Sequence, residues 1–438
     1  VRREIDSMAD YAVRYMIDFP YTEDDILDLL RSGSVEADEE ALRTWEDQGE
    51  LEFMNIDGEK RYFRWAHRNL YRINDSLRAE KQIDKQRNES LHALCKNEIE
   101  DIFHCAGITG YGEPGNNDKN RTGDSVQPAG MRFNPRKMRI NYTITVDADA
   151  VPEGEMIRCW MPYPREDSPR QDMVNLISAF PGEYIIAPGN VKQRSIYFEQ
   201  AAAGGEATVF SLELEYRSWS QFFDPEILAV SSDNHVPDSL LPLTVERLPH
   251  ISFSNGIREL AGGLVTDSMG PYEKAKAFYR WINDNIIWTS AVEYGLMHDI
   301  PGYVLKNGRG DCGMQTLLFL SLCRYAGIPA KWQSGWMMHP GHVNLHDWSE
   351  IWLDQAGWVP VDVSFKLQPS DNPLVEEFYI SGMDSYRLIV NDDYGRDLYP
   401  RKIYPRSEPL DFQRGELEWD GGNIYFDRWS YNMQVEYY

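Results

Sequence analysis

Three residues in the second half of the chain, Cys312, His346 and Asp362, are of the types that together perform covalent acyl chemistry. In such chemistry a cysteine sulfur attacks a carbonyl carbon, an imidazole takes and returns the proton, and a carboxylate holds the imidazole in one tautomer. The residues therefore predict a nucleophile, a general base and an orienting acid for thiol-dependent acyl transfer or hydrolysis. The surrounding elements must bring the three side chains together.

The cysteine is predicted to begin a buried helix. Gly308 and Gly310 allow a tight turn into it, and Asp311 is a suitable N-cap residue. In the first turn of a helix a sulfur lies near free backbone N–H groups and the positive end of the helix dipole, which favours thiolate over thiol. We therefore expect Cys312 to be a thiolate and its backbone N–H to be one oxyanion donor. Cys323, inside the apolar run of this helix, is expected to be buried and inert.

His346 and Asp362 are predicted to lie on neighbouring strands. The pattern indicates strands at 330–338, 347–353 and 358–364, with His346 opening the second and Asp362 inside the third. If these two strands are adjacent and antiparallel, the imidazole and the carboxylate can meet beside the start of the helix.

Three more side chains are expected around the cleft. Trp288 either supplies a second oxyanion donor through its indole N–H or only walls the cleft. Trp348 shares a strand face with His346 and is expected to shield the thiolate from water. His342 is expected at the mouth of the cleft.

Three histidines stand close together before and at the start of the second strand. They are His339, His342 and His346. Their spacing would gather metal ligands on a helix, but Pro340 and Gly341 break any helix there, so we predict no metal site and no cofactor. We place His339 in a surface loop. Whether residues 339–345 form a lid over the cysteine or an incidental metal site stays open.

The composition excludes some partners and one kind of scaffold. The 438 residues include 44 Lys and Arg and 70 Asp and Glu, a formal net charge of −26, which repels nucleic acid and anionic membranes. Five cysteines are too few for a disulfide framework, and at most Cys95 and Cys105 could form a bridge. No apolar run approaches the about 18 residues of a membrane span. The chain opens on Val-Arg-Arg-Glu, which we interpret as the mark of a removed targeting peptide.

The hydrophobic periodicity predicts an α+β protein of several units. A charged helical region at 1–106, expected to serve for packing or as a spacer, precedes a linker or long loop at 107–130 that is rich in Gly, Asn and Pro. Alternating strands then predict a β-sandwich at 131–225. The helix and strands of the candidate site belong to a core at 226–368, and a β-rich extension follows at 369–438.

The core resembles a known family. The blocks are GRGDCGMQTLLFLSLCRYAGIPAKWQSGW at 308–336, HDWSEIWL at 346–353 and GWVPVDVSF at 357–365. Together they are similar to the transglutaminase-like superfamily of papain-like cysteine enzymes, over about 267–365. The resemblance implies a catalytic triad of the cysteine, histidine and aspartate named above. Where the family pattern has Ala after the histidine, this chain has Asp347. The predicted sandwich looks like the N-terminal domain that accompanies such cores in bacterial proteins, which implies an exported bacterial protein, periplasmic or at the cell surface.

The resemblance leaves the reaction open. Family members include peptidases, amidases and cross-linking transamidases, and we expect hydrolysis of a peptide or protein substrate through a Cys312 thioester, because nothing in the sequence marks a calcium loop or an amine-recognition site. The alternatives are a protein-glutamine transamidase and a catalytically silent binding module. An acyl-CoA donor, as in the related arylamine acetyltransferases, fits the acidic chain poorly. The sequence does not indicate the oligomeric state.

Overall fold

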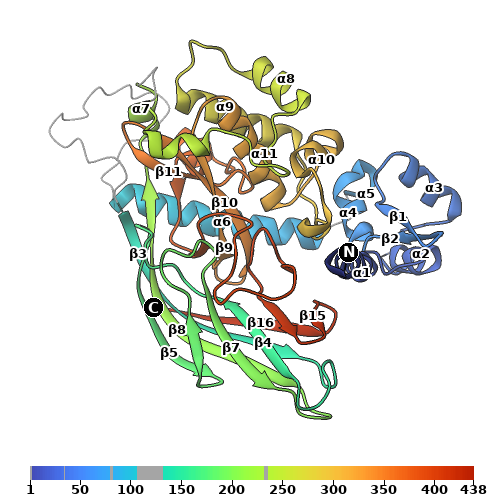
Figure 1. The fold of residues 1–438 in the computed structure, drawn as a ribbon. Helices are drawn as coiled ribbons and strands as arrows, with labels where there is room; N and C mark the ends of the chain where they lie inside the picture. The colour runs from blue at the N-terminus through green and yellow to red at the C-terminus, as the bar shows by residue number, and fades with distance from the viewer. Residues whose placement is uncertain (1, 34, 79–81, 106–131, 231–234) are drawn as a thin grey trace.

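A computed structural model describes residues 2–33, 35–78, 82–105, 132–230 and 235–438 of the chain. The linker predicted at 107–130 lies outside these described residues. Figure 1 shows a small lobe at the N-terminus, a helix-rich half around the candidate site, and a β-sandwich below it.

The N-terminal lobe is mostly helical, and its hydrophobic cluster also includes Val292 and Leu296 from the core region. A capping box at Thr22, whose side chain accepts from the backbone N–H of Asp25, starts its second helix. Its elements are α1 (Arg2–Asp18), α2 (Glu23–Ser32), α3 (Glu39–Asp47), β1 (Phe53–Ile56), β2 (Glu59–Tyr62), α4 (Ala66–Ile73) and α5 (Asp75–Arg78). The hairpin β1–β2 was not predicted, because its two strands are only four residues long.

Helix α6 (Gln82–Cys105) leaves the lobe and crosses the middle of the molecule between the helical half and the sandwich (Figure 1). The side chains of Cys95, Ile99, Ile102 and Phe103 are buried in the core that surrounds α11. The sequence predicts a largely solvated helix here. The structure instead encloses its apolar stripe between two other parts of the chain, which lie far away in sequence.

The sandwich consists of two five-stranded sheets. One has the order β12-β8-β3-β16, with β5 also paired to β8, and the other has the order β15-β14-β4-β7-β6. Alternate residues of β3, such as Ile140, Tyr142 and Ile144, are buried, as the period of two predicts. Its strands from the predicted region are β3 (Arg132–Val146), β4 (Met156–Pro162), β5 (Gln171–Phe180), β6 (Tyr184–Ile186), β7 (Ser195–Ala201) and β8 (Thr208–Phe222).

The C-terminal region contributes strands to both the sandwich and the core. Four of its strands pair within the sandwich, whereas β13 pairs with β9 of the core. Its elements are α12 (Pro373–Glu376), β12 (Gly382–Met383), β13 (Arg387–Asn391), β14 (Glu416–Trp419), β15 (Gly422–Ile424) and β16 (Trp429–Tyr437). The sequence predicts a β-rich extension at 369–438. In the structure, the strands of this region are hydrogen-bonded into the sandwich and the core. The sequence could not predict this pairing, because a strand pattern does not specify a distant partner.

The core places one buried helix against a four-stranded antiparallel sheet, of order β11-β10-β9-β13. Helix α11 is buried from Gly313 to Arg324, as its uniformly apolar sequence predicts. The core elements are α7 (Pro225–Leu228), α8 (Asn255–Leu264), α9 (Pro271–Asn285), α10 (Ile300–Asn307), α11 (Cys312–Tyr325), β9 (Ala330–Met337), β10 (Asn344–Leu353) and β11 (Gly357–Val361). In the described part of the chain, no helix is both long and apolar enough to cross a membrane.

Candidate active site

Cys312 is the first residue of α11, as predicted, and is half-buried. The N-cap residue Asp311 accepts a hydrogen bond from the backbone N–H of Met314 at 3.1 Å. It also accepts one from the hydroxyl of Tyr294. Burial raises the pKa of Asp311 to about 6. The helix start is therefore fixed by two donors on one carboxylate.

Gly313 leaves room for two side chains beside the cysteine. A Cβ atom at this position would lie 2.3 Å from the hydroxyl oxygen of Tyr294 and 2.7 Å from Oδ2 of Asp347. Both contacts are closer than real Cβ atoms approach. The glycine after the cysteine is thus required by packing, and sequence reasoning missed Tyr294 because it lies outside the three family blocks.

His346 and Asp362 meet as predicted. Strands β10 and β11 are adjacent and antiparallel, with Ser349 opposite Val361, and Asp362 directly follows β11 rather than lying within it. Nε2 of His346 lies 2.7 Å from Oδ2 of Asp362. The other carboxylate oxygen accepts from the hydroxyl of Ser364 at 3.1 Å. Both members of the pair are buried.

The charges of the pair follow from these contacts. Burial lowers the pKa of His346, although the charge of Asp362 opposes this. Burial opposes ionisation of Asp362, but the charges of His346 and Arg387 outweigh it and lower the pKa of the carboxyl group. At neutral pH the imidazole is therefore neutral and the carboxylate ionised. Since a carboxylate only accepts, Nε2 carries the proton and Nδ1 is left as the acceptor.

The hydrogen-bond partner of the cysteine is Asp347. The Sγ–H group of Cys312 donates to Oδ2 of Asp347 at 3.3 Å, while Oδ1 accepts from Nε2 of Gln413 at 2.6 Å. Successive residues of a strand point to opposite faces, so the side chains of His346 and Asp347 diverge. Within the described ranges, the recorded hydrogen bonds join cysteine to Asp347 and histidine to Asp362, and none joins the cysteine to the histidine.

The electrostatic prediction for Cys312 is wrong. Burial first, and then the charges of Asp347 and Asp311, raise the pKa of the thiol well above its usual value. The pKa of Asp347 is also raised well above its usual value by burial and by the charges of Asp411 and Asp311. Burial and these carboxyl groups together outweigh the helix dipole, which was the basis of the prediction. In this arrangement Cys312 is a neutral thiol.

The two tryptophans make contacts that the sequence did not predict. Trp348 shares the face of His346, but it is fully buried, its ring stacks on the imidazole with centroids 5.9 Å apart, and its indole N–H donates to Gln333. It therefore packs against the histidine, and its role in shielding the sulfur stays a prediction. Trp288 is 39% exposed and its ring lies under the guanidinium of Arg72. Its role as an oxyanion donor or cleft wall stays a prediction.

The other histidines hold helix α6. Nε2 of His342 lies 2.7 Å from the hydroxyl of Ser90, and Nε2 of His339 lies 3.3 Å from Oδ1 of Asp384 and 3.7 Å from Sγ of Cys95. The surface-loop prediction for His339 is wrong, because α6 covers this residue and leaves it fully buried. Each of the three histidines has a different partner. No His, Cys, Asp and Glu cluster suited to a metal occurs in the described parts of the chain.

The bridge considered between Cys95 and Cys105 is also excluded. Both residues are free thiols on α6, ten positions apart on one rigid helix. Cys95 is buried against His339, whereas Cys105 is exposed and faces Asn134.

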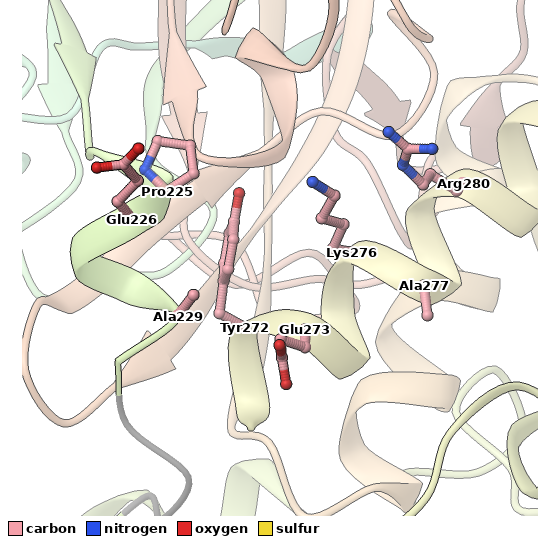
Figure 2. Close-up of a pocket in the computed structure, with 8 residues that line it drawn as sticks. All are labelled: Pro225, Glu226, Ala229, Tyr272, Glu273, Lys276, Ala277 and Arg280. Atoms are coloured by element: carbon pink, nitrogen blue, oxygen red, sulfur yellow. The ribbon is translucent and has the colours of Figure 1, made fainter. Parts of the chain in front are cut away.

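A pocket of about 620 Å³ opens on another side of the core, between α7 and α9 (Figure 2). Its lining comprises Pro225, Glu226, Ala229, Tyr272, Glu273, Lys276, Ala277 and Arg280. Two cations in it, Lys276 and Arg280, both bind the carboxylate of Glu377. None of the candidate catalytic residues lines this pocket, so it is distinct from the site at Cys312.

Comparison with known proteins identifies the family of the core. Residues 258–363 match the model of the transglutaminase-like superfamily, and this stretch includes Cys312, His346 and Asp362. A search of curated proteins found no match. A crystal structure of a candidate cysteine protease from Cytophaga hutchinsonii is 16% identical, with a TM-score of 0.48, and the alignment covers 70% of this chain and 92% of that one.

A second structure, the periplasmic domain of TgpA from Pseudomonas aeruginosa, is 13% identical, with a TM-score of 0.29 and coverage of 58% of this chain and 100% of that one. Both structures are distant from this chain, so the assignment of the core to the superfamily rests on the match at residues 258–363.

Proposed function

We propose that this chain, which carries a transglutaminase-like domain at residues 258–363, is a cysteine hydrolase that acts on a peptide-like amide. Cys312 is the nucleophile, His346 the general base and Asp362 the group that holds the imidazole. The observation that supports this most strongly is the buried contact of 2.7 Å between His346 and Asp362. His346 lies on β10, and the next residue of this strand, Asp347, contacts Cys312 at the start of α11.

The proposed reaction has two halves. The proton of Cys312 passes to Nδ1 of His346 as the sulfur attacks the carbonyl carbon, and the backbone N–H of Cys312 stabilises the oxyanion. The amine then leaves with that proton, and a thioester remains. Water attacks the thioester, giving one proton to His346, and the acid is released as the sulfur regains the proton. Asp362 stays ionised throughout and stabilises the imidazolium.

The proposal requires the thiol to leave Asp347. In the structure the sulfur donates to this carboxylate, and its raised pKa makes it a weak nucleophile at rest. Attack therefore depends on His346 accepting the proton as the substrate binds. A thiol that never leaves Asp347 would make the core a silent binding module, which is the second function that this contact favours.

Trapping the thioester tests the proposal. The folded full-length chain is incubated with a library of blocked peptides that includes glutamine donors, quenched in acid, and analysed by intact mass and peptide mapping. We expect an acyl adduct on Cys312 and amide cleavage, both absent in Cys312→Ala. Neither adduct nor cleavage would overturn the proposal in favour of the binding module.

A primary amine added to the same reaction separates hydrolysis from transamidation. Water and the amine compete for one thioester, so the product ratio reports which acceptor the site prefers. Hydrolysis is expected to dominate, and the transamidase function is supported if the amine is incorporated in preference to water.

We also propose that the protein acts outside the cytoplasm, as expected for the bacterial group that its motifs resemble. Fractionation of cells that express the full-length protein, followed by immunodetection, tests this location.

A further inference from the structure

A series of alternating buried charges continues from Asp362, on the side away from His346. Nη2 of Arg387 lies 3.2 Å from Oδ2 of Asp362 and 3.0 Å from Oδ2 of Asp384. Nε2 of His339 lies 3.3 Å from the other oxygen of Asp384. All four residues are fully buried. Carboxylate, guanidinium, carboxylate and imidazolium thus follow one another in the protein interior.

The two middle members of the series are fixed by further contacts. Asp384 accepts from the hydroxyl of Tyr379 at 2.9 Å and from the backbone N–H of Tyr386 at 2.8 Å. The guanidinium of Arg387 lies over the ring of Phe365, 4.2 Å from its centroid. Arg387 therefore has little freedom to move.

The first carboxylate is shared. Oδ2 of Asp362 is the atom that both His346 and Arg387 contact, at 2.7 and 3.2 Å. Rotation of this carboxylate would break both contacts at once. Arg387 thus limits the orientation of the group that in turn holds the imidazole.

We propose that Arg387, held in place by Asp384, is a positioning residue that fixes Asp362 against His346. This assignment rests on the proposed function, because it takes His346 as the base. Arg387 is well placed for the role, since it begins β13, which pairs with β9 of the catalytic sheet. Its carbonyl also accepts from the hydroxyl of Tyr216 in β8, at 3.2 Å.

The series reaches the N-terminal part of the chain. His339 lies 3.7 Å from Sγ of Cys95 in α6, and the adjacent His342 contacts Ser90 in the same helix. The loop between β9 and β10, which leads directly into His346, is thereby held at two points. Helix α6 supports the candidate base through this loop and through His339.

The charges around His346 determine the sign of the test. Facing it are Asp362 after β11, Arg387 of β13 and His339 of the β9–β10 loop, whereas Asp347 is adjacent on β10 but points to the other face. Arg387 and His339 lower the pKa of His346, and Asp362 raises it. Loss of the Arg387 charge must therefore raise the pKa of His346.

The experiment measures that pKa directly. The full-length chain with ¹³C-labelled histidine is titrated by NMR, and the signal of His346 is assigned by its absence in His346→Gln. Arg387→Gln is expected to move the midpoint upward by about one pH unit. Arg387→Lys keeps the charge but lacks the rigid guanidinium whose Nη2 contacts both carboxylates, so its midpoint should lie between that of the wild type and that of Arg387→Gln.

Arg165→Gln is the matched control. It removes a guanidinium of equal burial that pairs with Asp167 in the sandwich, and it should leave the His346 midpoint unchanged. An Arg387→Gln variant that folds with an unshifted midpoint would overturn the inference. If that variant does not fold, Arg387→Lys decides, because a midpoint identical to the wild type would contradict a bridging role.

A second readout separates this inference from the proposed function. The pH dependence of Cys312 alkylation should follow the His346 midpoint in each variant. If alkylation proves independent of His346 while the NMR midpoint still shifts in Arg387→Gln, the coupling stands and the proposed function fails. If alkylation depends on His346 but neither readout responds to Arg387, the proposed function stands and the positioning role of Arg387 fails.

Discussion

At the scale of single residues, the cysteine and the histidine of the site have opposite electrostatic surroundings. Cys312 is among carboxyl groups that raise the pKa of its thiol, whereas His346 is held neutral against an ionised Asp362. The three family blocks allowed the identity of these residues to be predicted. The ionisation of Cys312 was mispredicted, because it depends on burial and on the charge of Asp347, whose position beside the sulfur follows from the packing of β10 against α11 and not from any local pattern.

Replacing Asp347 should activate the thiol. Asp347→Ala, which gives the residue usual in the family, and Asp347→Asn, which keeps the shape, both remove the acidic group that raises the pKa of the thiol. A shift of about one to two units in the thiol pKa would raise the iodoacetamide alkylation rate at neutral pH by about tenfold or more. The rate is measured by peptide mapping of the labelled Cys312. Slower alkylation in both variants would mean that Asp347 itself takes the proton.

At the scale of elements, local periodicity predicts well those parts of the site that are continuous in sequence. Helix α11 and strands β9 to β11 lie close to their expected positions, because an apolar run and alternating residues specify them directly. Strand β13 and helix α6 could not be placed at the site from sequence. Strand β13 reaches the site by pairing with β9, and α6 reaches it through the contacts of Cys95 and Ser90. All of these contacts join residues that are far apart in sequence.

The start of α11 offers a test of packing. Gly313→Ala should lower the free energy of unfolding by about 1–3 kcal/mol, since the new methyl group would collide with Tyr294 and Asp347. Gly262→Ala in α8 is the control, because a Cβ there has no atom within 4 Å and alanine favours a helix. Denaturant unfolding measures both. Equal stability of the two variants would contradict the packing described here.

At the scale of the whole molecule, segments from both the N-terminal and the C-terminal parts of the chain contact the loop between β9 and β10. His339 contacts α6 from the N-terminal part and Asp384 from the C-terminal part, while its own loop leads into His346. The C-terminal strands complete both the sandwich and the sheet of the core. The C-terminal region at 369–438 is therefore shared between the sandwich and the core.

This central contact predicts a pH dependence of stability. Burial opposes protonation of His339, but the charge of Asp384 outweighs it and raises the pKa to about 9. The resulting stabilisation is complete below the ordinary histidine pKa of about 6.5 and is lost as the pH rises through about 9. Denaturant unfolding of the wild type and of His339→Gln should differ more at about pH 6 than at about pH 10.

His342→Gln is the control for this comparison, because His342 also contacts α6 but its pKa is lowered. The difference in unfolding free energy between the wild type and His342→Gln should not decrease between about pH 6 and about pH 10. A stability difference for His339→Gln that stays constant with pH would contradict an ion pair at this position.

The most direct test of the central claim is the alkylation rate of Cys312 as a function of pH, in the wild type and in His346→Ala, with buried Cys323 as the internal reference. We predict selective labelling of Cys312 whose acid limb has a midpoint below the ordinary histidine pKa. We also expect His346→Ala to abolish this limb and to slow labelling at neutral pH by at least about tenfold. Identical rates and pH dependence in the two proteins would contradict a cysteine activated by His346.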